Sequence, residues 1–348
     1  MQKITASDWI SFLACPKCAG SLASISGLDL PAANDSLSCS SCATVYPIHN
    51  HVPVLLAEST AAEKKTQSLY GNIWRGYSEK KPNRSQRGYD APATSNLELL
   101  RLASGTELVQ GRMGIDAGCG SGDSTIAMAR LHPGIRFIGV DLAPGVFHAA
   151  SKAADIPNVC FVQGNLLAPP LAKQKYDFVY SFGVLHHTRS PETAFRLLLD
   201  CLRPGGRITI FVYKDFSDLP IKKWLLIPVT LVRRLTSRLP SGLLRKLAWI
   251  GAPLIFFFLT LPARFLRRHG FQRFARHIPY GIFPRLTAIA SSLEDRLGVP
   301  YEHRFSLSDL QDWAKTANLQ NVRAVDCLPW GFSGLVLSGC LPGEIVRS

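Results

Sequence analysis

The chain has few acidic residues for its size. It contains 25 Asp and Glu against 39 Lys and Arg among 348 residues, which gives a formal net charge of +14. Acid is absent altogether from the segment 219–293, which holds thirteen of the Lys and Arg residues. These cations account for nearly all of the excess charge, which excludes an evenly basic surface and places the basic character in one segment.

A secretory signal is also missing from the first residues. Residues 1–14 carry one Lys but neither a continuous apolar run nor a small-residue cleavage site. The nine cysteines are therefore expected to be reduced thiols or metal ligands in a cytoplasmic protein, rather than a disulfide framework. Internal repeats and low-complexity tracts are absent too, which excludes repeat architectures. With 47% hydrophobic residues, the chain is globular and long enough for an α/β domain with one or two additions.

Two Cys-x-x-Cys pairs, separated by 20 residues, mark the segment 1–57 as a unit. Thiolates three positions apart on a tight turn can hold one metal ion, and two such turns complete a tetrahedral site. A redox dithiol needs only one such pair. Because four thiolates leave no open coordination position, the pattern predicts a structural zinc ribbon. The expected zinc ligands are Cys15, Cys18, Cys39 and Cys42.

A glycine cluster that follows the apolar run 113–115 indicates a ligand site. The pattern from Asp116 to Gly122 is D-x-G-x-G-x-G, and Asp141 ends the next strand-like run 19 residues later. The glycines let the backbone approach a ligand, and the second acid can accept both hydroxyls of a ribose. Asp116 would repel the phosphates of a dinucleotide but suits a cation, which favours S-adenosylmethionine. The alternative is an ordinary tight turn between a strand and a helix.

The elements after this site resemble a known family in their order. Strand-like runs at 158–165 and 176–181 are followed by Gly-Val-Leu-His-His, a helix at 191–202 and a fifth strand at 207–212. The chain is similar here to the class I S-adenosylmethionine-dependent methyltransferases, especially the type 11 group that includes ubiquinone and menaquinone methyltransferases. The resemblance covers about 115–212, with a tail at 305–338. It implies a Rossmann-like α/β fold with a seven-stranded sheet.

The resemblance also implies which residues hold the cofactor. Asp116 and the backbone of its loop bind the amino-acid end, Asp141 binds the ribose hydroxyls, and Asn165 lies beside the adenine. Many relatives have Asp where Asn165 stands, but an amide oxygen can still accept a hydrogen bond from the adenine amino group. The full set of expected cofactor residues is Asp116, Ala117, Gly118, Cys119, Gly120, Gly122, Asp141, Leu142, Asn165, Leu166 and Ser181.

Two histidines follow the fourth strand, where the methyl group is expected to emerge. His186 and His187 are the titratable pair near this point whose ordinary pKa lies close to neutrality. One of them, with a slight preference for His187, is expected to be the catalytic base for a hydroxyl acceptor. The alternative is that one caps the next helix and the other packs beneath the cofactor. The Asn/Asp-Pro-Pro-aromatic sequence of base and glutamine methyltransferases is absent, which argues against those reactions.

The sequence divides into five expected parts. Residues 45–56 resemble the small zinc-ribbon subunits that activate RNA and protein methyltransferases, so such a module is expected to be fused here to a catalytic domain. The alternative is a ribbon that only caps the fold. The parts are a zinc ribbon at 1–57, a linker and lid or helix region at 58–110, a cofactor-binding core at 111–218, an insertion at 219–293 and the rest of the core at 294–348.

The acid-free insertion at 219–293 falls between the fifth and sixth strands and contains two apolar runs with basic flanks. The run at 247–263 is uncharged over 17 residues, which is the short limit for a spanning helix, and Pro253 and Pro262 interrupt it. A helical element on an anionic membrane surface is favoured over one that binds nucleic acid, because RNA-binding patches seldom contain such apolar runs. A helical cap over a substrate pocket is an equal alternative.

These expectations combine into one functional hypothesis. The chain is expected to be an S-adenosylmethionine-dependent methyltransferase with structural zinc, acting on a small hydrophobic or lipid-linked acceptor under the insertion, with a possible contact to the inner face of the membrane. One alternative is an RNA methyltransferase acting on rRNA or tRNA. Another is a non-catalytic scaffold that binds the cofactor and recruits a partner through the ribbon.

Overall fold

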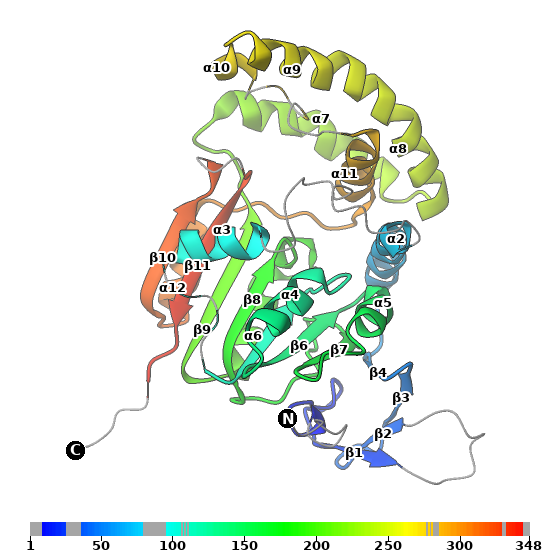
Figure 1. The fold of residues 1–348 in the computed structure, drawn as a ribbon, viewed down its shortest axis with the longest axis vertical. Helices are drawn as coiled ribbons and strands as arrows, with labels where there is room; N and C mark the ends of the chain where they lie inside the picture. Colours follow the sequence, from blue (N-terminus) through cyan, green and yellow to red (C-terminus); the bar gives the residue numbers. More distant parts are fainter. Residues whose placement is uncertain are drawn as a thin grey trace. The chain divides into compact units, whose positions relative to one another are not determined.

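The computed structural model describes residues 9–25, 36–78, 95–105, 107, 109, 111–275, 278, 280, 285–328 and 332–343. The chain forms two compact units (Figure 1). The first combines Met1–Thr60, Ala93–Asp218 and Tyr301–Ser348, and the second combines Ala61–Pro92 and Leu219–Pro300. The loop predicted at 80–89 lies outside the described residues.

One sheet runs through the first unit. Its strands are β1 (Leu22–Ile25), β2 (Ser36–Cys39), β3 (Val45–His49), β4 (Val52–Leu55), β5 (Met113–Ala117), β6 (Arg136–Asp141), β7 (Val159–Gly164), β8 (Tyr176–Phe182), β9 (Leu202–Tyr213), β10 (Gln320–Asp326) and β11 (Gly334–Cys340). Their order in space is β1-β2-β3-β4-β7-β6-β5-β8-β9-β11-β10. The pairs from β4 to β9 are parallel, whereas β11 is antiparallel to both of its neighbours. The stretch from β7 to β10 is the predicted seven-stranded Rossmann-like sheet, which is confirmed.

Helices cover both faces of the central strands. The helices α3 (Ser95–Ser104), α4 (Asp123–Leu131) and α5 (Gly145–Lys152) belong to one buried cluster, and α6 (Pro191–Cys201) and α12 (Leu307–Thr316) belong to the other. Alternate residues of β6 divide between them, since Phe137 packs in the first cluster and Ile138 in the second. Strands buried on both faces read as unbroken apolar runs, which is why the sequence reveals them.

The cysteine-rich segment is joined to this sheet by an added strand. β4 pairs in parallel with β7, with Val54 opposite Gln163. Trp9 and Leu13 belong to the same buried cluster as Ile115 of β5. The segment at 1–57, predicted as a unit of its own, therefore shares both a sheet and a core with the cofactor-binding strands.

The second unit is helical, as the insertion was predicted to be. Its elements are α2 (Ala61–Ser78), α7 (Pro220–Thr236), α8 (Ser241–Ile255), the π-helical turn η2 (Phe256–Thr260), α9 (Leu261–Arg268), α10 (Gln272–Ala275) and α11 (Leu286–Gly298). Elements α8, η2 and α9 form one run of 28 residues, Ser241–Arg268. Within the described part of the chain, this run alone is long and apolar enough to cross a membrane.

Small side chains let the helices of the second unit pack closely. Ala252 of α8 meets Ala288 and Ile289 of α11 in one buried cluster. Tyr70 of α2 donates a hydrogen bond of 2.7 Å to Asp295 Oδ1 of α11, and its ring stacks on Trp74 at 6.5 Å. Tyr70 thus has packing partners inside its own unit, and the lid expected as one alternative for the region 58–110 stays a prediction.

Candidate functional site

The two acids of the glycine motif lie at the carboxyl ends of neighbouring strands. Asp116 is opposite Gly139 in the parallel ladder of β5 and β6, and Asp141 ends β6. The turn between β5 and α4 is tied down by two hydrogen bonds, because the N–H groups of Gly118 and Cys119 donate to the carbonyl of Val140 at 2.7 and 3.1 Å. These two hydrogen bonds fix the backbone of the turn between the two acids, as a preformed ligand site requires.

Glycine is required in this turn for two physical reasons. Gly118 has a φ of +85°, in the left-handed region that side chains rarely adopt. A Cβ at this position would also lie 2.2 Å from Cγ2 of Val184. Only glycine at position 118 leaves room for the Val184 side chain this close to the turn backbone.

The carboxyl group of Asp116 is buried. It accepts a hydrogen bond of 2.6 Å from the Thr125 hydroxyl of α4, and the residue is 4% exposed. Burial raises the pKa of Asp116 to about 7, and the nearby Asp141 carboxylate adds to the rise. A buried acid with a raised pKa is stabilised in its charged form by a cation, so the ammonium group of S-adenosylmethionine fits this position.

Asp141 is held by backbone donors on both of its oxygens. The N–H of Gly120 donates to Oδ2 and the N–H of Ala143 to Oδ1, each at 2.8 Å. Burial nevertheless raises the pKa of this acid. Each carboxylate oxygen has a second lone pair, so the carboxylate can still accept the two hydroxyls of a ribose. The backbone contacts fix its orientation for that role.

The other predicted cofactor residues border the same edge of the sheet. Ser181 donates to the carbonyl of Ala117 at 2.7 Å, so its hydroxyl fixes the start of the glycine turn. Gln163 donates to the carbonyl of Leu142 at 3.0 Å. The Oδ1 of Asn165 accepts from the N–H of Leu167 at 2.9 Å. The structure thus places Ser181 as a support of the turn and Asn165 at the end of β7, one strand beyond Asp141.

The predicted catalytic histidines lie side by side in a buried position. They belong to the short helix η1 (Leu185–His187), with ring centroids 4.2 Å apart. His186 is fully buried and stacks on Tyr213 at 3.8 Å, and neither of its ring nitrogens has a hydrogen-bond partner among the described residues. Burial, together with the nearby His187 and Arg304, lowers the pKa of His186 well below its ordinary value. His186 is therefore neutral at physiological pH.

His187 has a defined tautomer. Its Nδ1 lies 3.1 Å from the carbonyl oxygen of Tyr301. A carbonyl oxygen only accepts, so Nδ1 carries a proton, and in the neutral ring the lone pair resides on Nε2. This is the tautomer that can accept a proton at Nε2.

A third histidine and an arginine complete this cluster, and sequence reasoning missed both. The N–H of His303 donates to the carbonyl of His186 at 2.8 Å, and burial lowers the pKa of its ring. Arg304 lies over the Tyr213 ring at 5.4 Å. The long insertion separates these residues from η1 in the sequence, and no motif links the two segments. Only the fold could reveal their contact.

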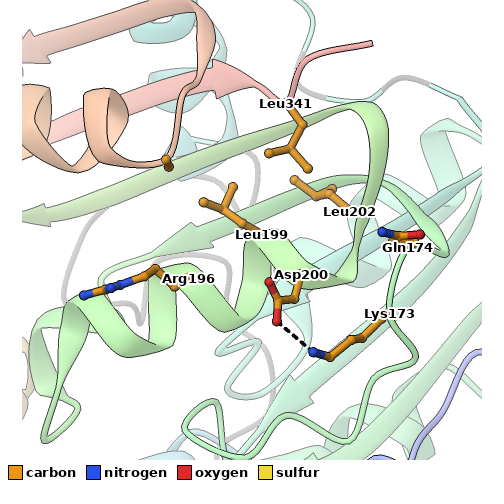
Figure 2. A pocket seen from close by; sticks show the side chains of 8 residues that line it. Lys173, Gln174, Arg196, Leu199, Asp200, Leu202 and Leu341 are labelled. Carbon is orange, nitrogen blue, oxygen red and sulfur yellow. Dashed lines mark hydrogen bonds and ion pairs between the residues drawn. The ribbon is translucent and has the colours of Figure 1, made fainter. Parts of the chain in front are cut away.

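A surface pocket lies away from the candidate cofactor site. Figure 2 shows its lining, in which Asp200 of α6 forms an ion pair of 3.0 Å with Lys173. Lys173 precedes β8, and Leu202 begins β9, so the pocket lies at the amino ends of these strands. Asp116 and Asp141 lie at carboxyl ends, which is the opposite edge of a parallel sheet. We assign no function to this pocket.

The four predicted zinc ligands converge in the first unit. Their Sγ atoms all lie within 4.8 Å of one another, with Cys15 and Cys42 at 3.7 Å and Cys18 and Cys39 at 3.4 Å. A tetrahedral zinc site with bonds of about 2.3 Å needs sulfur–sulfur distances of about 3.8 Å. The Thr44 hydroxyl and backbone lower the pKa of Cys42 to about 6, which favours the thiolate that binds metal. The donor set fits zinc.

The comparisons with known proteins agree with this site. Residues 115–210 match the family model described as "Methyltransferase domain". A tRNA U34 carboxymethyltransferase of Hahella chejuensis is 34% identical over 125 residues, which cover 35% of this chain and 38% of that protein. A demethylmenaquinone methyltransferase of Lactococcus lactis is 25% identical over 165 residues, which cover 46% of this chain and 63% of that protein. The chain thus spans less than two thirds of either relative.

A solved structure also matches most of the chain. The 1,6-didemethyltoxoflavin-N1-methyltransferase of Burkholderia thailandensis matches 90% of this chain and 98% of its own, at 14% identity and a TM-score of 0.43. The parallel sheet, with a glycine turn between two acids, defines the first unit as a Rossmann-like ligand-binding fold. Within it, residues 115–210 match the methyltransferase-domain family model.

Proposed function

We propose that the protein is an S-adenosylmethionine-dependent methyltransferase with a small hydrophobic or lipid-linked acceptor. The observation that carries this proposal is the arrangement of Asp116 and Asp141 at adjacent strand ends, on either side of a fixed glycine turn. S-adenosylmethionine carries an ammonium group and ribose hydroxyls. The buried acid suits the first, and the backbone-anchored acid suits the second.

The residues of the chain act mainly by binding and alignment. Asp116 takes the ammonium group, Asp141 takes the ribose hydroxyls, and Asn165 lies beside the adenine. When bound, S-adenosylmethionine supplies a methyl group on a sulfonium. Bound in this way, it would place that methyl group where an acceptor nucleophile could approach it. Since the methyl donor is intrinsically reactive, holding both partners in line supplies much of the acceleration.

His187 is the proposed proton acceptor where the nucleophile is a hydroxyl. Its Nδ1 is held by the Tyr301 carbonyl, which leaves the basic lone pair on Nε2. His186 is neutral and stacked on Tyr213, so its proposed role is to position His187 rather than to exchange a proton. This proposal refines the expected preference for His187.

The apolar insertion and one relative support the proposed acceptor class. The segment 219–293 is rich in exposed apolar side chains, and the demethylmenaquinone methyltransferase is named for a hydrophobic substrate. An RNA acceptor is the second candidate. It is supported by the basic charge of the same segment and by the tRNA carboxymethyltransferase among the relatives.

The test is methyl transfer from tritiated S-adenosylmethionine into the lipid, RNA and protein fractions of a lysate, with the purified full chain as enzyme. Label in the lipid fraction supports the first proposal, and label in RNA supports the second. Binding of the cofactor without transfer to any fraction would favour the non-catalytic scaffold. Asp141→Ala is expected to weaken cofactor binding by at least about ten-fold, since it removes the acceptor for two hydroxyls. Unchanged binding would overturn the placement of the ribose.

A further inference from the structure

The second unit carries a large apolar surface. In the described part of the chain, 17 of the 22 large hydrophobic side chains that are exposed belong to this unit. They are Trp224, Ile227, Leu231, Val232, Leu235, Leu243, Leu247, Trp249, Ile250, Leu254, Phe257, Phe258, Leu261, Phe265, Phe271, Phe274 and Leu286. Exposed apolar side chains that gather in one unit mark an interaction surface.

The long run Ser241–Arg268 has two distinct faces. The inner face is made of small or buried residues, namely Leu244, Ala248, Ala252, Thr260 and Ala263. The outer face carries large apolar residues at steps of three or four, which we call the apolar stripe: Leu243, Leu247, Ile250, Leu254, Phe257, Leu261 and Phe265. The π-helical turn η2 adds a residue to one turn, which keeps Thr260 and Ala263 on the inner face.

Basic residues lie at both ends of the apolar stripe. Arg245 and Lys246 are exposed near its start, and Arg264 and Arg268 near its end. The two basic pairs are separated by about 18 to 23 residues, or about 27 to 35 Å along a helix. The positions between them, 247–263, are uncharged. The stripe is therefore a long apolar surface bounded by cations.

A second helix repeats this arrangement. On α7, Trp224, Leu231 and Leu235 are exposed by 71%, 53% and 69%. Lys223 and Arg234 are exposed on the same helix. Two helices of one unit thus combine outward apolar side chains with cations, in a segment that holds no acid.

We propose that the second unit binds the surface of an anionic lipid bilayer, with the apolar stripe lying in the plane of the interface. The apolar side chains enter the boundary between headgroups and acyl chains, and the cations at both ends meet lipid phosphates. The proposed membrane binding does not depend on methyl transfer, and it applies whichever acceptor the protein uses.

The inner face excludes a spanning orientation. Ala252 packs on Ala288 and Ile289 of α11, which also carries Glu294 and Asp295. A helix that crossed the bilayer would draw these carboxylates into hydrocarbon at a high free-energy cost. A helix lying flat exposes only the stripe to lipid and leaves α11 above the headgroups.

Charge decides between lipid and the other occupants. A second copy of the same surface would bring its own cations against these, without an acid on 219–293 to pair with them. RNA would neutralise the cations but would leave the apolar stripe in water. An anionic bilayer satisfies both the cations and the stripe.

The test is co-sedimentation of the full chain with vesicles of phosphatidylcholine alone or with about 30 mol% phosphatidylglycerol at physiological salt. The native chain is expected to bind the anionic vesicles at least about ten-fold more tightly. The stripe variant, which combines Ile250→Ser, Leu254→Ser and Phe257→Ser, is expected to lower that binding about 100-fold, because it removes three large apolar groups from the stripe. The charge variant Lys246→Gln, Arg264→Gln, Arg268→Gln is expected to remove the preference for anionic lipid.

A matched control changes exposed apolar residues of the first unit, with Val45→Ser, Leu102→Ser and Leu131→Ser. Binding of this control is expected to equal that of the native chain. Thermal unfolding verifies that each variant folds. Should the stripe variant fail to fold, quenching of native tryptophan fluorescence by lipids brominated in the acyl chains tests the membrane contact of the second unit, which exposes Trp224 and Trp249.

Several outcomes would overturn the proposal. One is equal vesicle binding by the native chain and a folded stripe variant. Another is an absence of Trp quenching. Binding to bulk RNA without vesicle binding, lost in the charge variant, would assign the surface to nucleic acid. Dimerisation of the native chain that is lost in the stripe variant, again without vesicle binding, would assign the surface to contact with a second copy of the chain.

Discussion

Asp116 is buried, and it is proposed to bind the cationic group of the cofactor. The effect of its burial on cofactor binding can be measured. Its pKa lies at about 7, because burial opposes the negative charge. The acid is then largely neutral at pH 6 and largely ionised at pH 8. Only the ionised form attracts an ammonium group, so binding of S-adenosylmethionine is expected to be about ten-fold tighter at pH 8 than at pH 6.

Isothermal titration calorimetry at a series of pH values measures this dependence. Asp116→Asn keeps the shape of the side chain and removes the titrating group. It is expected to bind the cofactor weakly and with little change over the same pH range. A variant that retained the native pH dependence would place the linked proton on another group.

Gly118 tests the close approach of the turn to Val184. Gly118→Ala is expected to lower the stability of the protein by about 1–3 kcal/mol and to weaken cofactor binding, because the new Cβ meets Val184 in a left-handed backbone. The matched control is Gly183→Ala. Gly183 has a φ of +76° but has nothing within 4 Å of an added Cβ.

Thermal unfolding and calorimetry compare the two variants. The control carries the backbone strain alone, so the difference between them isolates the contact with Val184. Adding Val184→Ala to Gly118→Ala is expected to recover part of the loss. Equal effects of the two glycine substitutions would show that strain, and not contact, governs the turn.

At the scale of elements, the central strands were predictable because both of their faces are buried. The β5 and β8 segments are buried at nearly every position, and each is followed by a turn with glycine. Asp116 and Asp141 could be identified because parallel strands place their carboxyl ends at one edge. Local pattern and fold agree at these positions.

Other contacts depend on tertiary structure and could not be predicted. The β4 strand joins β7 across more than a hundred residues, although Val52 and Leu55 indicate only a short buried strand. The contact of His303 with His186 depends on where the chain returns after the insertion. The π-helical turn η2 lies inside an apolar helical run, and no distinctive sequence signal marks its position.

The ribbon gives a prediction at the same scale. Cys15→Ser is expected to abolish zinc binding and to unfold the segment around β1 to β3, because structural zinc contributes about 10–16 kcal/mol in small metal-dependent folds. Cys340→Ser, at a thiol outside the cluster, is the control and is expected to keep one zinc per chain. Metal analysis and hydrogen exchange report the two effects. Full zinc content in Cys15→Ser would contradict the assignment of this ligand.

The whole molecule combines two units with different chemistry. The first holds the cysteine cluster and the two acids, and the second holds most of the basic charge and exposed apolar surface. The chain enters the second unit twice, once through α2 and once through the insertion. Each unit has buried clusters of its own, so each has its own source of stability.

This organisation predicts two unfolding transitions in calorimetry, each sensitive to a different ligand. S-adenosylmethionine at 100 times its dissociation constant is expected to stabilise the first unit by about 2.7 kcal/mol and to raise only its transition. Asp141→Ala should reduce that shift. Anionic vesicles should alter the transition of the second unit alone, and the stripe variant should abolish this effect. A single transition that responds to both ligands would mean that the units unfold as one, and that binding at either site is coupled to the other through stability.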